Sequence, residues 1–453
     1  MPLRFAHSVL VLGIIFLALI LVYVGVGHER FLSSPARIAT NAGLPILGIC
    51  LIAGAFWLRP DTRLTIAIIL TSVAVSVWGF ELALTAEIFP SDRANAEAFV
   101  SPAHDNRTTN MVVMDLRASG IRSYPPVPSS YILRLDSQGA ISSRLSIDDE
   151  PLLSLAGVRD TRTPLCNETG TWFTFQSDQY GFNNPNDVWA EAESDVVAVG
   201  DSFTMGLCAD VGSGFVDNIR KAYPLTINLG YSGNGPLAEL AALKEYGSKS
   251  KPRNVLWFFF EGNDIPSNLE FERRSSILMN YLDAGYSQSL LDKTEKIDEL
   301  LRAFVDEAYA VGDQEGAGKR SLFVKLWTFL SLSRTRNRLL PTPRADKADF
   351  DLFQKVLREA DRSVREWGGR LTLVYLPAFS RFVDGPSDDV YEQVRLNTLA
   401  TAGALNIRIV DMTTEFMQHH DPLSLFTTRT GGHYNNDGHE LVSNAVKGVL
   451  NAD

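Results

Sequence analysis

A short apolar segment of the chain ends directly before a serine. Residues 194–206 read SDVVAVGDSFTMG, and the apolar run 196–199 stops one residue before Asp201 and Ser202. This run has the length and composition of a buried strand, and ligands of open α/β sheets bind beyond the carboxyl ends of the strands. Ser202 therefore stands where a nucleophile would meet a substrate. The same residues also suit the start of a helix, because Asp and Ser are good N-caps.

Three later segments contain the other groups that a serine nucleophile needs, and each follows an expected strand. NLGYSGNGP (228–236) is rich in glycine, which allows tight turns and leaves backbone N–H groups open toward a ligand. FFFEGND (258–264) presents Asn263, and GGHYNNDGH (431–439) presents His433 just before the last expected helix. A nucleophile, oxyanion donors and a base would then share one rim of the sheet.

These four segments, in this order over residues 195–449, resemble the four blocks of the SGNH (GDSL) hydrolase family. The resemblance implies that Ser202 is the nucleophile and His433 the base. It also implies an oxyanion hole formed by the Ser202 N–H, the Gly233 N–H and the Asn263 side chain. Members of the family hydrolyse or transfer carboxylic esters, and no cofactor is expected.

The chain departs from the family pattern at the acid that orients the histidine. The family usually has an aspartate two or three residues before the histidine, whereas this chain has Thr430 and Gly431 before His433. Either a Ser–His dyad operates, with a backbone carbonyl holding the ring, or a carboxylate reaches in from elsewhere. A relative without activity is the third alternative. The candidate acids are Asp421, Glu261 and Asp264.

The first ninety residues predict a membrane anchor. Three apolar stretches, 8–27, 38–58 and 64–84, each have about the ~20 residues that a spanning helix requires. Basic residues are nearly balanced between the two sides, with a slight bias that favours an N-terminus inside. We therefore expect a multi-pass protein of the cytoplasmic (inner) membrane, in contact with the lipid bilayer. The part after residue 90 is then periplasmic or extracellular.

Beyond the anchor we expect two further regions. Residues 91–180 are rich in Pro, Ser, Asp and Gly and predict an irregular β-rich accessory region. Residues 181–453 alternate strands and helices, which predicts a parallel sheet covered on both faces, with a helical insertion at 266–345. The resemblance implies the three-layer α/β/α, flavodoxin-like form of this fold. The strands are expected at 195–200, 225–229, 254–260, 371–376 and 406–410, and the helices near 214–222, 236–249, 349–366, 389–404 and 437–449.

Composition excludes some classes of protein and partner. The net charge of −11 over 453 residues, with no basic block, argues against nucleic acid. Of three cysteines, Cys50 lies in an apolar stretch, while Cys166 and Cys208 lie in the polar part and are expected to pair in an oxidising compartment. The histidines show no metal-ligand spacing, so no metal site is predicted, and His439 is expected to start or cap the last helix.

The sequence thus predicts a membrane-anchored serine esterase that hydrolyses O-acyl esters, with O-acetyl groups on cell-envelope glycans as the expected substrate. That substrate rests on location and family analogy alone. An O-acyltransferase acting on cell-surface polysaccharide with the same site is one alternative. The other is a non-catalytic glycan-binding or assembly protein on the same fold, which the absent aspartate favours.

Overall fold

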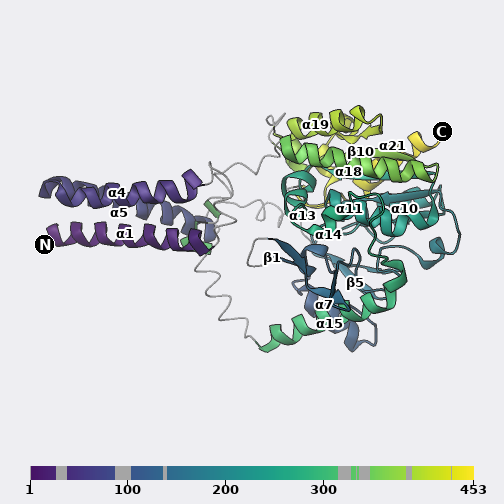
Figure 1. Ribbon diagram of the computed structural model, residues 1–453, viewed down its shortest axis with the longest axis horizontal. Coiled ribbons are helices and arrows are strands. Elements are labelled where there is room, and N and C mark those ends of the chain that lie inside the picture. The colour runs from purple at the N-terminus through teal and green to yellow at the C-terminus, as the bar shows by residue number, and fades with distance from the viewer. Residues whose placement is uncertain are drawn as a thin grey trace. The chain divides into compact units, whose positions relative to one another are not determined.

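The chain divides into two compact units (Figure 1). The computed structural model describes residues 2–26, 38–86, 104–135, 140–314, 328–332, 334–335, 347–383, 390–429 and 431–452. The first unit comprises Met1–Ser91, Ser137–Gly139 and Gly316–Thr342, and the second comprises the rest of the chain. The expected accessory and hydrolase regions therefore fall in one unit, and part of the expected helical insertion clusters with the N-terminal helices.

The first unit is built on apolar helices that pack side by side (Figure 1). These are α1 (Pro2–Val26), α4 (Leu44–Gly54) and α5 (Pro60–Thr85), with a π turn at Ala39–Gly43 and a 3₁₀ turn at Ala55–Trp57 on either side of α4. Two of the helices, 2–25 and 60–85, are long and apolar enough to cross a membrane.

The middle apolar stretch, expected at 38–58, forms a helix of mixed type. It combines the π turn at Ala39–Gly43, α4 and the 3₁₀ turn at Ala55–Trp57, and it ends where Leu58 is extended and Pro60 opens the next helix. Of the three expected spans, two are thus long apolar helices in the described part of the chain, and the middle one is not a regular α-helix throughout.

A five-stranded parallel sheet forms the centre of the second unit. Its strand order is β8–β7–β9–β10–β11, in which β7 and β9 lie next to each other and the chain turns outward on both sides of them. This order is that of a flavodoxin-like doubly wound sheet. The strands match those expected from the sequence and are β7 (Val196–Val199), β8 (Thr226–Asn228), β9 (Asn254–Phe260), β10 (Arg370–Leu376) and β11 (Arg408–Asp411).

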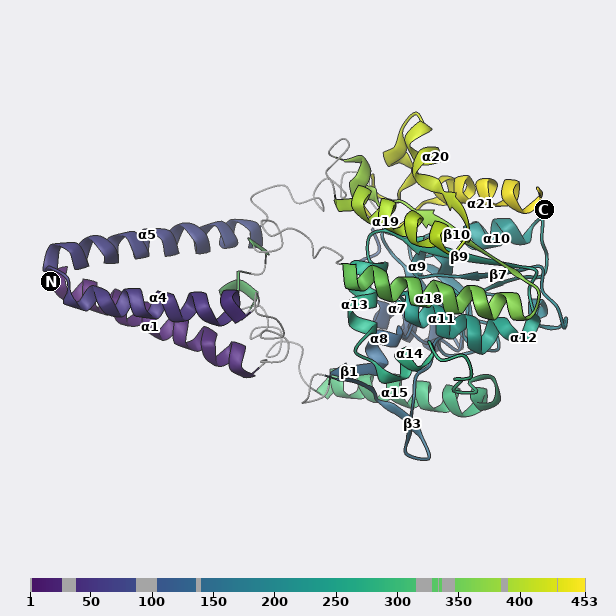
Figure 2. The same cartoon turned by 45° about the horizontal axis from the view of Figure 1, so that its top comes forward.

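Successive side chains of each strand point to opposite faces of the sheet, and helices cover both faces. Val197 and Trp257 pack with α11 and α18, which lie together on one face (Figure 2), whereas Val196 and Phe258 pack with α10 and α21 on the other. The expected three layers are thus present. The helices of the second unit's sheet are α9 (Ser202–Met205), α10 (Phe215–Arg220), α11 (Pro236–Ala242), α12 (Ser248–Ser250), α18 (Lys347–Glu366), α19 (Val390–Ala404), α20 (Met412–Gln418) and α21 (Asn436–Leu450).

The accessory region is a set of short antiparallel hairpins that share the core of the sheet domain. Leu153 and Val158 are buried in the same cluster as the α11 face, and the backbone N–H of Val127 donates to the buried Tyr231 hydroxyl at 3.1 Å. Its elements are α7 (Thr109–Ala118), α8 (Ser129–Ile132), β1 (Leu133–Leu135), β2 (Ile141–Ser143), β3 (Leu145–Ile147), β4 (Glu150–Leu152), β5 (Arg162–Cys166) and β6 (Phe173–Gln176).

The described part of the expected insertion is mostly helical. After β9 the chain forms a π turn at Asp264–Leu269 and the short helices α13 (Glu270–Glu272) and α14 (Ser276–Asn280). The longer helix α15 (Thr294–Gln314) follows, and its Leu301 and Val305 are buried in the main core. Residues 315–327, 333 and 336–346 of the insertion lie outside the described residues.

Candidate active site

Ser202 occupies the carboxyl-terminal tip of β7, at the first position of the one-turn helix α9. Asp201 caps this helix, because its carboxylate accepts the Phe203 N–H at 2.9 Å. The turn before it needs glycine at position 200, since a Cβ there would lie 2.1 Å from the Thr204 hydroxyl oxygen. The helix ends at Gly206, which has φ +86°. The sequence therefore builds a tight strand-to-helix turn that presents the serine.

His433 approaches the serine from the loop before α21. Its Nε2 lies 2.9 Å from Ser202 Oγ, and its ring lies against that of Phe203 with 4.6 Å between the centroids. Asn435 caps α21 by accepting the Gly438 N–H at 3.1 Å, which fixes the end of this loop. The two residues that the sequence nominated as nucleophile and base are thus in hydrogen-bond contact.

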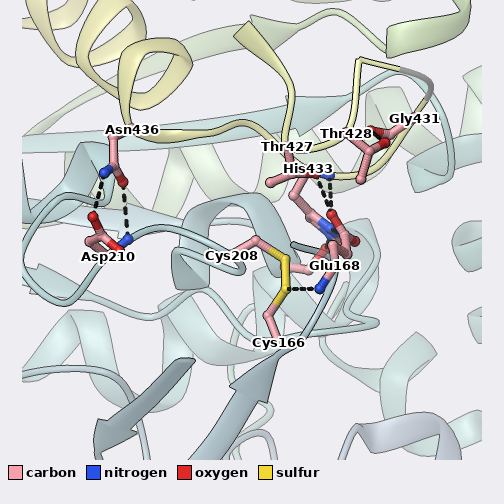
Figure 3. Close-up of a disulfide and its surroundings, with 10 residues drawn as sticks. Cys166, Glu168, Cys208, Asp210, Thr427, Thr428, Gly431, His433 and Asn436 are labelled. Atoms are coloured by element: carbon pink, nitrogen blue, oxygen red, sulfur yellow. Dashed lines mark hydrogen bonds and ion pairs between the residues drawn. A yellow bond between two sulfur atoms is a disulfide. The ribbon is translucent and has the colours of Figure 1, made fainter. Parts of the chain in front are cut away.

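The acid that contacts the histidine is Glu168, in the turn between β5 and β6. Its Oε1 lies 2.7 Å from His433 Nδ1, while Oε2 accepts the His433 N–H at 2.9 Å and the Thr427 hydroxyl at 2.7 Å (Figure 3). Glycine is needed at position 432, where φ is +90° and a Cβ would lie 2.3 Å from Glu168 Oε2. The orienting carboxylate therefore comes from the accessory region, outside the four segments that resemble the family pattern, and it was not predicted from the sequence.

The surroundings of Glu168 favour its ionised form. Partial burial raises the pKa of this carboxyl, but hydrogen bonds from the His433 side chain and backbone and from the Thr427 hydroxyl, together with the imidazolium charge, outweigh it. The pKa falls to about 2. Glu168 is therefore an anion at physiological pH, as the acid of a catalytic triad must be.

The three acids nominated from the sequence were the wrong ones, because each is engaged elsewhere. Asp421 pairs with Arg429 at 2.7 Å, and buried Glu261 pairs with the Arg381 guanidinium at 2.5 Å. Asp264 is fully buried and accepts a backbone N–H of β9 at 2.7 Å, and burial raises its pKa well above the usual range. Among the described residues, none of the three contacts the imidazole. Of the two positions where the acid was expected, Thr430 lies outside the described residues and Gly431 has no side chain.

The Ser202 and Gly233 N–H groups are the expected backbone donors of the oxyanion hole. Within the described part of the chain, the N–H groups of Ser202 and Gly233 donate to no acceptor. Gly233 has φ +79°, a conformation that favours glycine. Its loop is held beside the nucleophile turn by a hydrogen bond from the Tyr231 N–H to the Gly200 carbonyl at 3.1 Å.

Asn263 lies at the end of β9, next to the nucleophile turn. Its side-chain amide donates to Asp201 Oδ2 at 3.3 Å, which leaves the second amide hydrogen for another acceptor. Its Oδ1 is buried without a hydrogen-bond partner among the described residues. Asn263 therefore contacts the residue directly before Ser202.

The expected disulfide between Cys166 and Cys208 is present, with 5.2 Å between the Cα atoms, and Cys50 is a free, exposed cysteine. The two sulfurs and a carboxylate oxygen of Glu168 all lie within 4.8 Å of one another. Because both sulfurs are bonded in the disulfide, this group offers no thiolate to a metal ion.

His439 is structural, although it does not begin or cap the last helix as expected. It lies inside α21, where Asn435 is the cap, and its buried Nδ1 accepts the Phe215 N–H at 3.1 Å. Burial, with a smaller contribution from the His433 charge, lowers the pKa of His439 to about 3. This ring is neutral at physiological pH and joins α21 to α10.

No protein-family model matches the chain, and no curated protein matches it. Among solved structures, it is similar to a lipolytic protein of the G-D-S-L family from Desulfitobacterium hafniense (14% identity, 57% of this chain and 99% of that one, TM-score 0.32). It is also similar to a lipase/acylhydrolase from Enterococcus faecalis (13%, 57% and 96%, 0.31) and to the acetyl xylan esterase AlAXEase (12%, 56% and 98%, 0.32). Such low scores carry no argument, so the chemistry is inferred from the chain's own residues.

Proposed function

We propose that this chain is a serine esterase that hydrolyses O-acyl esters through a Ser202–His433–Glu168 triad. The observation that carries the proposal is the unbroken line of contacts from Ser202 Oγ to His433 Nε2 at 2.9 Å and from His433 Nδ1 to Glu168 Oε1 at 2.7 Å. A serine hydroxyl is a weak nucleophile until a base takes its proton, and an imidazole with an anionic partner does so near neutral pH.

The reaction proceeds through an acyl-enzyme. Ser202 Oγ attacks the ester carbonyl as His433 Nε2 takes its proton, and the Glu168 anion stabilises the imidazolium that forms. The imidazolium then protonates the leaving alcohol, and the acyl group remains on Ser202. A water molecule, deprotonated by the same imidazole, attacks the acyl-enzyme and releases the carboxylic acid.

The oxyanion of each tetrahedral intermediate needs donors that are already in place. The N–H groups of Ser202 and Gly233, which donate to no described residue, and the free amide hydrogen of Asn263 supply them in this proposal. Removing one such donor typically costs ~10²–10³ in rate.

The contact between Glu168 and His433 argues against the non-catalytic alternative. That alternative rested on the absence of an aspartate before His433, and the carboxylate of Glu168 fills the same role from another part of the chain. A binding protein has no need for a buried serine, an imidazole and an ionised carboxylate in hydrogen-bond sequence. The geometry therefore favours catalysis.

We propose further that the esterase domain is anchored in a membrane. In α1 and α4 the side chains of Leu12, Leu19, Val22 and Leu51 are each more than 60% exposed, an arrangement that suits lipid rather than water. The disulfide fits an oxidising compartment outside the cytoplasm. On this placement the substrates within reach are acylated glycans of the cell envelope, with O-acetyl groups as the proposed acyl group.

The test is hydrolysis of p-nitrophenyl acetate by the full-length protein in detergent. The wild type should release p-nitrophenol in a saturable manner, and Ser202→Ala should fall to the rate of buffer. Equal rates for the two proteins would overturn the proposal. Adding a sugar acceptor to the assay separates the alternatives, because an acyltransferase would form acylated sugar at the expense of free acetate.

A further inference from the structure

The disulfide lies against the acid of the proposed triad. The Glu168 N–H donates to Cys166 Sγ at 3.4 Å, and a carboxylate oxygen of Glu168 lies within 4.8 Å of both sulfurs (Figure 3). Cys166 is the last residue of β5, and Cys208 follows the nucleophile helix, in which the Leu207 N–H donates to the Ser202 carbonyl at 3.0 Å. The bond therefore joins the segment that carries the acid to the segment that carries the nucleophile.

The turn that carries Glu168 is bound to a neighbouring segment by hydrogen bonds that do not involve Glu168. Asn167 donates to the Asp105 carbonyl at 2.6 Å, and the Gly170 carbonyl accepts the Asp105 N–H at 2.8 Å. The β5–β6 pairing is irregular between Pro164 and Cys166, so the ladder weakens just before the turn. Among the described residues, the hydrogen bonds of the Glu168 carboxylate run to the histidine loop, and the disulfide is the covalent link from this turn to the nucleophile segment.

The other end of the bond is also held in a conformation that the chain does not favour by itself. Cys208 has φ +65°, in the left-handed region that residues with a side chain rarely adopt. Such conformations persist where the surrounding structure fixes them. Release of Cys208 would remove the covalent link that holds this residue beside the Glu168 turn.

We propose that the Cys166–Cys208 disulfide is a positioning element for Glu168, so that full esterase activity requires the oxidised protein and a dithiol lowers it reversibly. This inference rests on the proposed function. In the redox step the dithiol reduces the bond by thiol–disulfide exchange, through a mixed disulfide. The sulfurs of Cys166 and Cys208 each gain a hydrogen, and the dithiol becomes a cyclic disulfide.

Reduction should weaken the enzyme without abolishing it. The contact between Ser202 and His433 does not involve the disulfide, so the reduced protein keeps a Ser–His dyad with a poorly oriented ring. Loss of the acid's effect lowers kcat by on the order of 10³–10⁴ in a serine protease. We expect a fall of about 10²–10³, because a mobile Glu168 still reaches the imidazole part of the time. Newly made enzyme would have low esterase activity until the Cys166–Cys208 disulfide forms.

The experiment compares oxidised and dithiothreitol-reduced full-length protein in detergent, with thiols counted by mass spectrometry. Wild type should lose kcat on reduction and regain it on reoxidation, and Cys166→Ser/Cys208→Ser should behave like the reduced form. The acidic limb of its pH–rate profile should shift in the same direction as that of Glu168→Gln. Cys50→Ser is the matched control, since its free thiol lies outside the second unit, and it should respond as wild type does.

The decisive comparison is reduction of the Glu168→Gln variant. If the disulfide acts through Glu168, reduction should change the kcat of this variant by less than about twofold. The loss of kcat on reduction and the loss of kcat from the substitution are then not additive, because one group acts through the other. An equal fall in both proteins would contradict the inference, as would wild type that keeps its kcat with both thiols free. Global unfolding of the reduced protein, seen by circular dichroism, would also contradict it. If oxidised wild type is no more active than Ser202→Ala, the proposed function itself fails.

Discussion

Glu168 and His433 stand 265 residues apart in the sequence, yet the carboxylate of one lies 2.7 Å from Nδ1 of the other. The same carboxylate accepts the backbone N–H of His433 at 2.9 Å, so it holds both the ring and the loop that carries it. A single side chain from the accessory hairpin thus fixes the geometry of the base. The accessory region is therefore part of the proposed catalytic machinery rather than an appendage to it.

Replacing Glu168 with glutamine should cut kcat by on the order of 10³–10⁴, with KM changed much less. Glutamine keeps the size of the side chain but removes the charge that stabilises the imidazolium. The acidic limb of the pH–rate profile should therefore move to lower pH than in the wild type. Steady-state kinetics of p-nitrophenyl acetate hydrolysis across pH measure both effects. If Glu168→Gln had the same kcat and pH–rate profile as the wild type, Glu168 would not be part of the triad.

Asp421→Asn, which likewise replaces a carboxylate by its amide, is the matched control. The ion pair of Asp421 with Arg429 lies at the surface and is screened by solvent, so Asp421→Asn should keep both activity and stability. Glu261→Gln should instead lower the thermal midpoint, since it leaves the buried Arg381 without its anion. A loss of kcat at unchanged stability in either variant would restore that residue as a candidate acid.

The depressed pKa of Glu168 predicts how its contribution to stability varies with pH. Its folded pKa of about 2 lies below the ordinary value of 4.5, so between these values the unfolded chain binds more protons than the folded one. The stabilisation by Glu168 is therefore complete above about pH 4.5 and is lost as the pH falls through about 2. The difference in thermal midpoint between wild type and Glu168→Gln should shrink as the pH falls from about 4.5 toward 2. If the difference in thermal midpoint grew as the pH fell, Glu168 would not be an anion stabilised by its contacts in the folded protein.

The two histidines of the last block should separate catalysis from stability. His433→Ala removes the proposed base and should lower kcat by several orders of magnitude with little change in thermal midpoint. His439→Ala leaves the buried Phe215 N–H without an acceptor, which costs about 1–3 kcal/mol of stability, while the folded fraction should retain most of its activity. Thermal unfolding and active-site titration of both variants measure stability and activity separately. If His433→Ala lost stability and His439→Ala lost kcat, His439 would be the base and His433 the structural residue.

Asn263→Ala should lower kcat by about 10²–10³ through the loss of one oxyanion donor. Asn263→Asp is the sharper variant, because a carboxylate beside the developing oxyanion should be worse than no donor at all. The ester assay with both variants tests this. Activity in Asn263→Ala close to that of the wild type would take this residue out of the oxyanion hole.

The sheet and three of the site segments could be predicted because their signals are local. Four-residue to seven-residue apolar strands ending in polar residues mark the carboxyl edge of a parallel sheet, and Ser202, Asn263 and His433 follow from that edge. The pairing of Cys166 and Cys208 was also accessible, because the polar part of the chain holds no other cysteine. None of these inferences required knowledge of how the accessory region packs.

Glu168 could not be found in the same way. It belongs to a hairpin turn with no periodicity, and only the tertiary packing of β5 and β6 brings it to the histidine loop. Its neighbour Cys166 was the one available signal, since a disulfide to Cys208 places residues near position 166 close to the nucleophile turn. The π turn at Ala39–Gly43 and the 3₁₀ turn at Ala55–Trp57 in the middle apolar stretch could not be predicted either, because hydropathy does not distinguish one type of helix from another.

Covalent trapping of the nucleophile by a fluorophosphonate probe, followed by peptide mapping, is the most direct test of the proposed triad. We expect one adduct per chain, on Ser202, which is absent in Ser202→Ala and forms much more slowly in His433→Ala and Glu168→Gln. An adduct on any other residue, or labelling of Ser202 at the wild-type rate in both the histidine and glutamate variants, would contradict the triad.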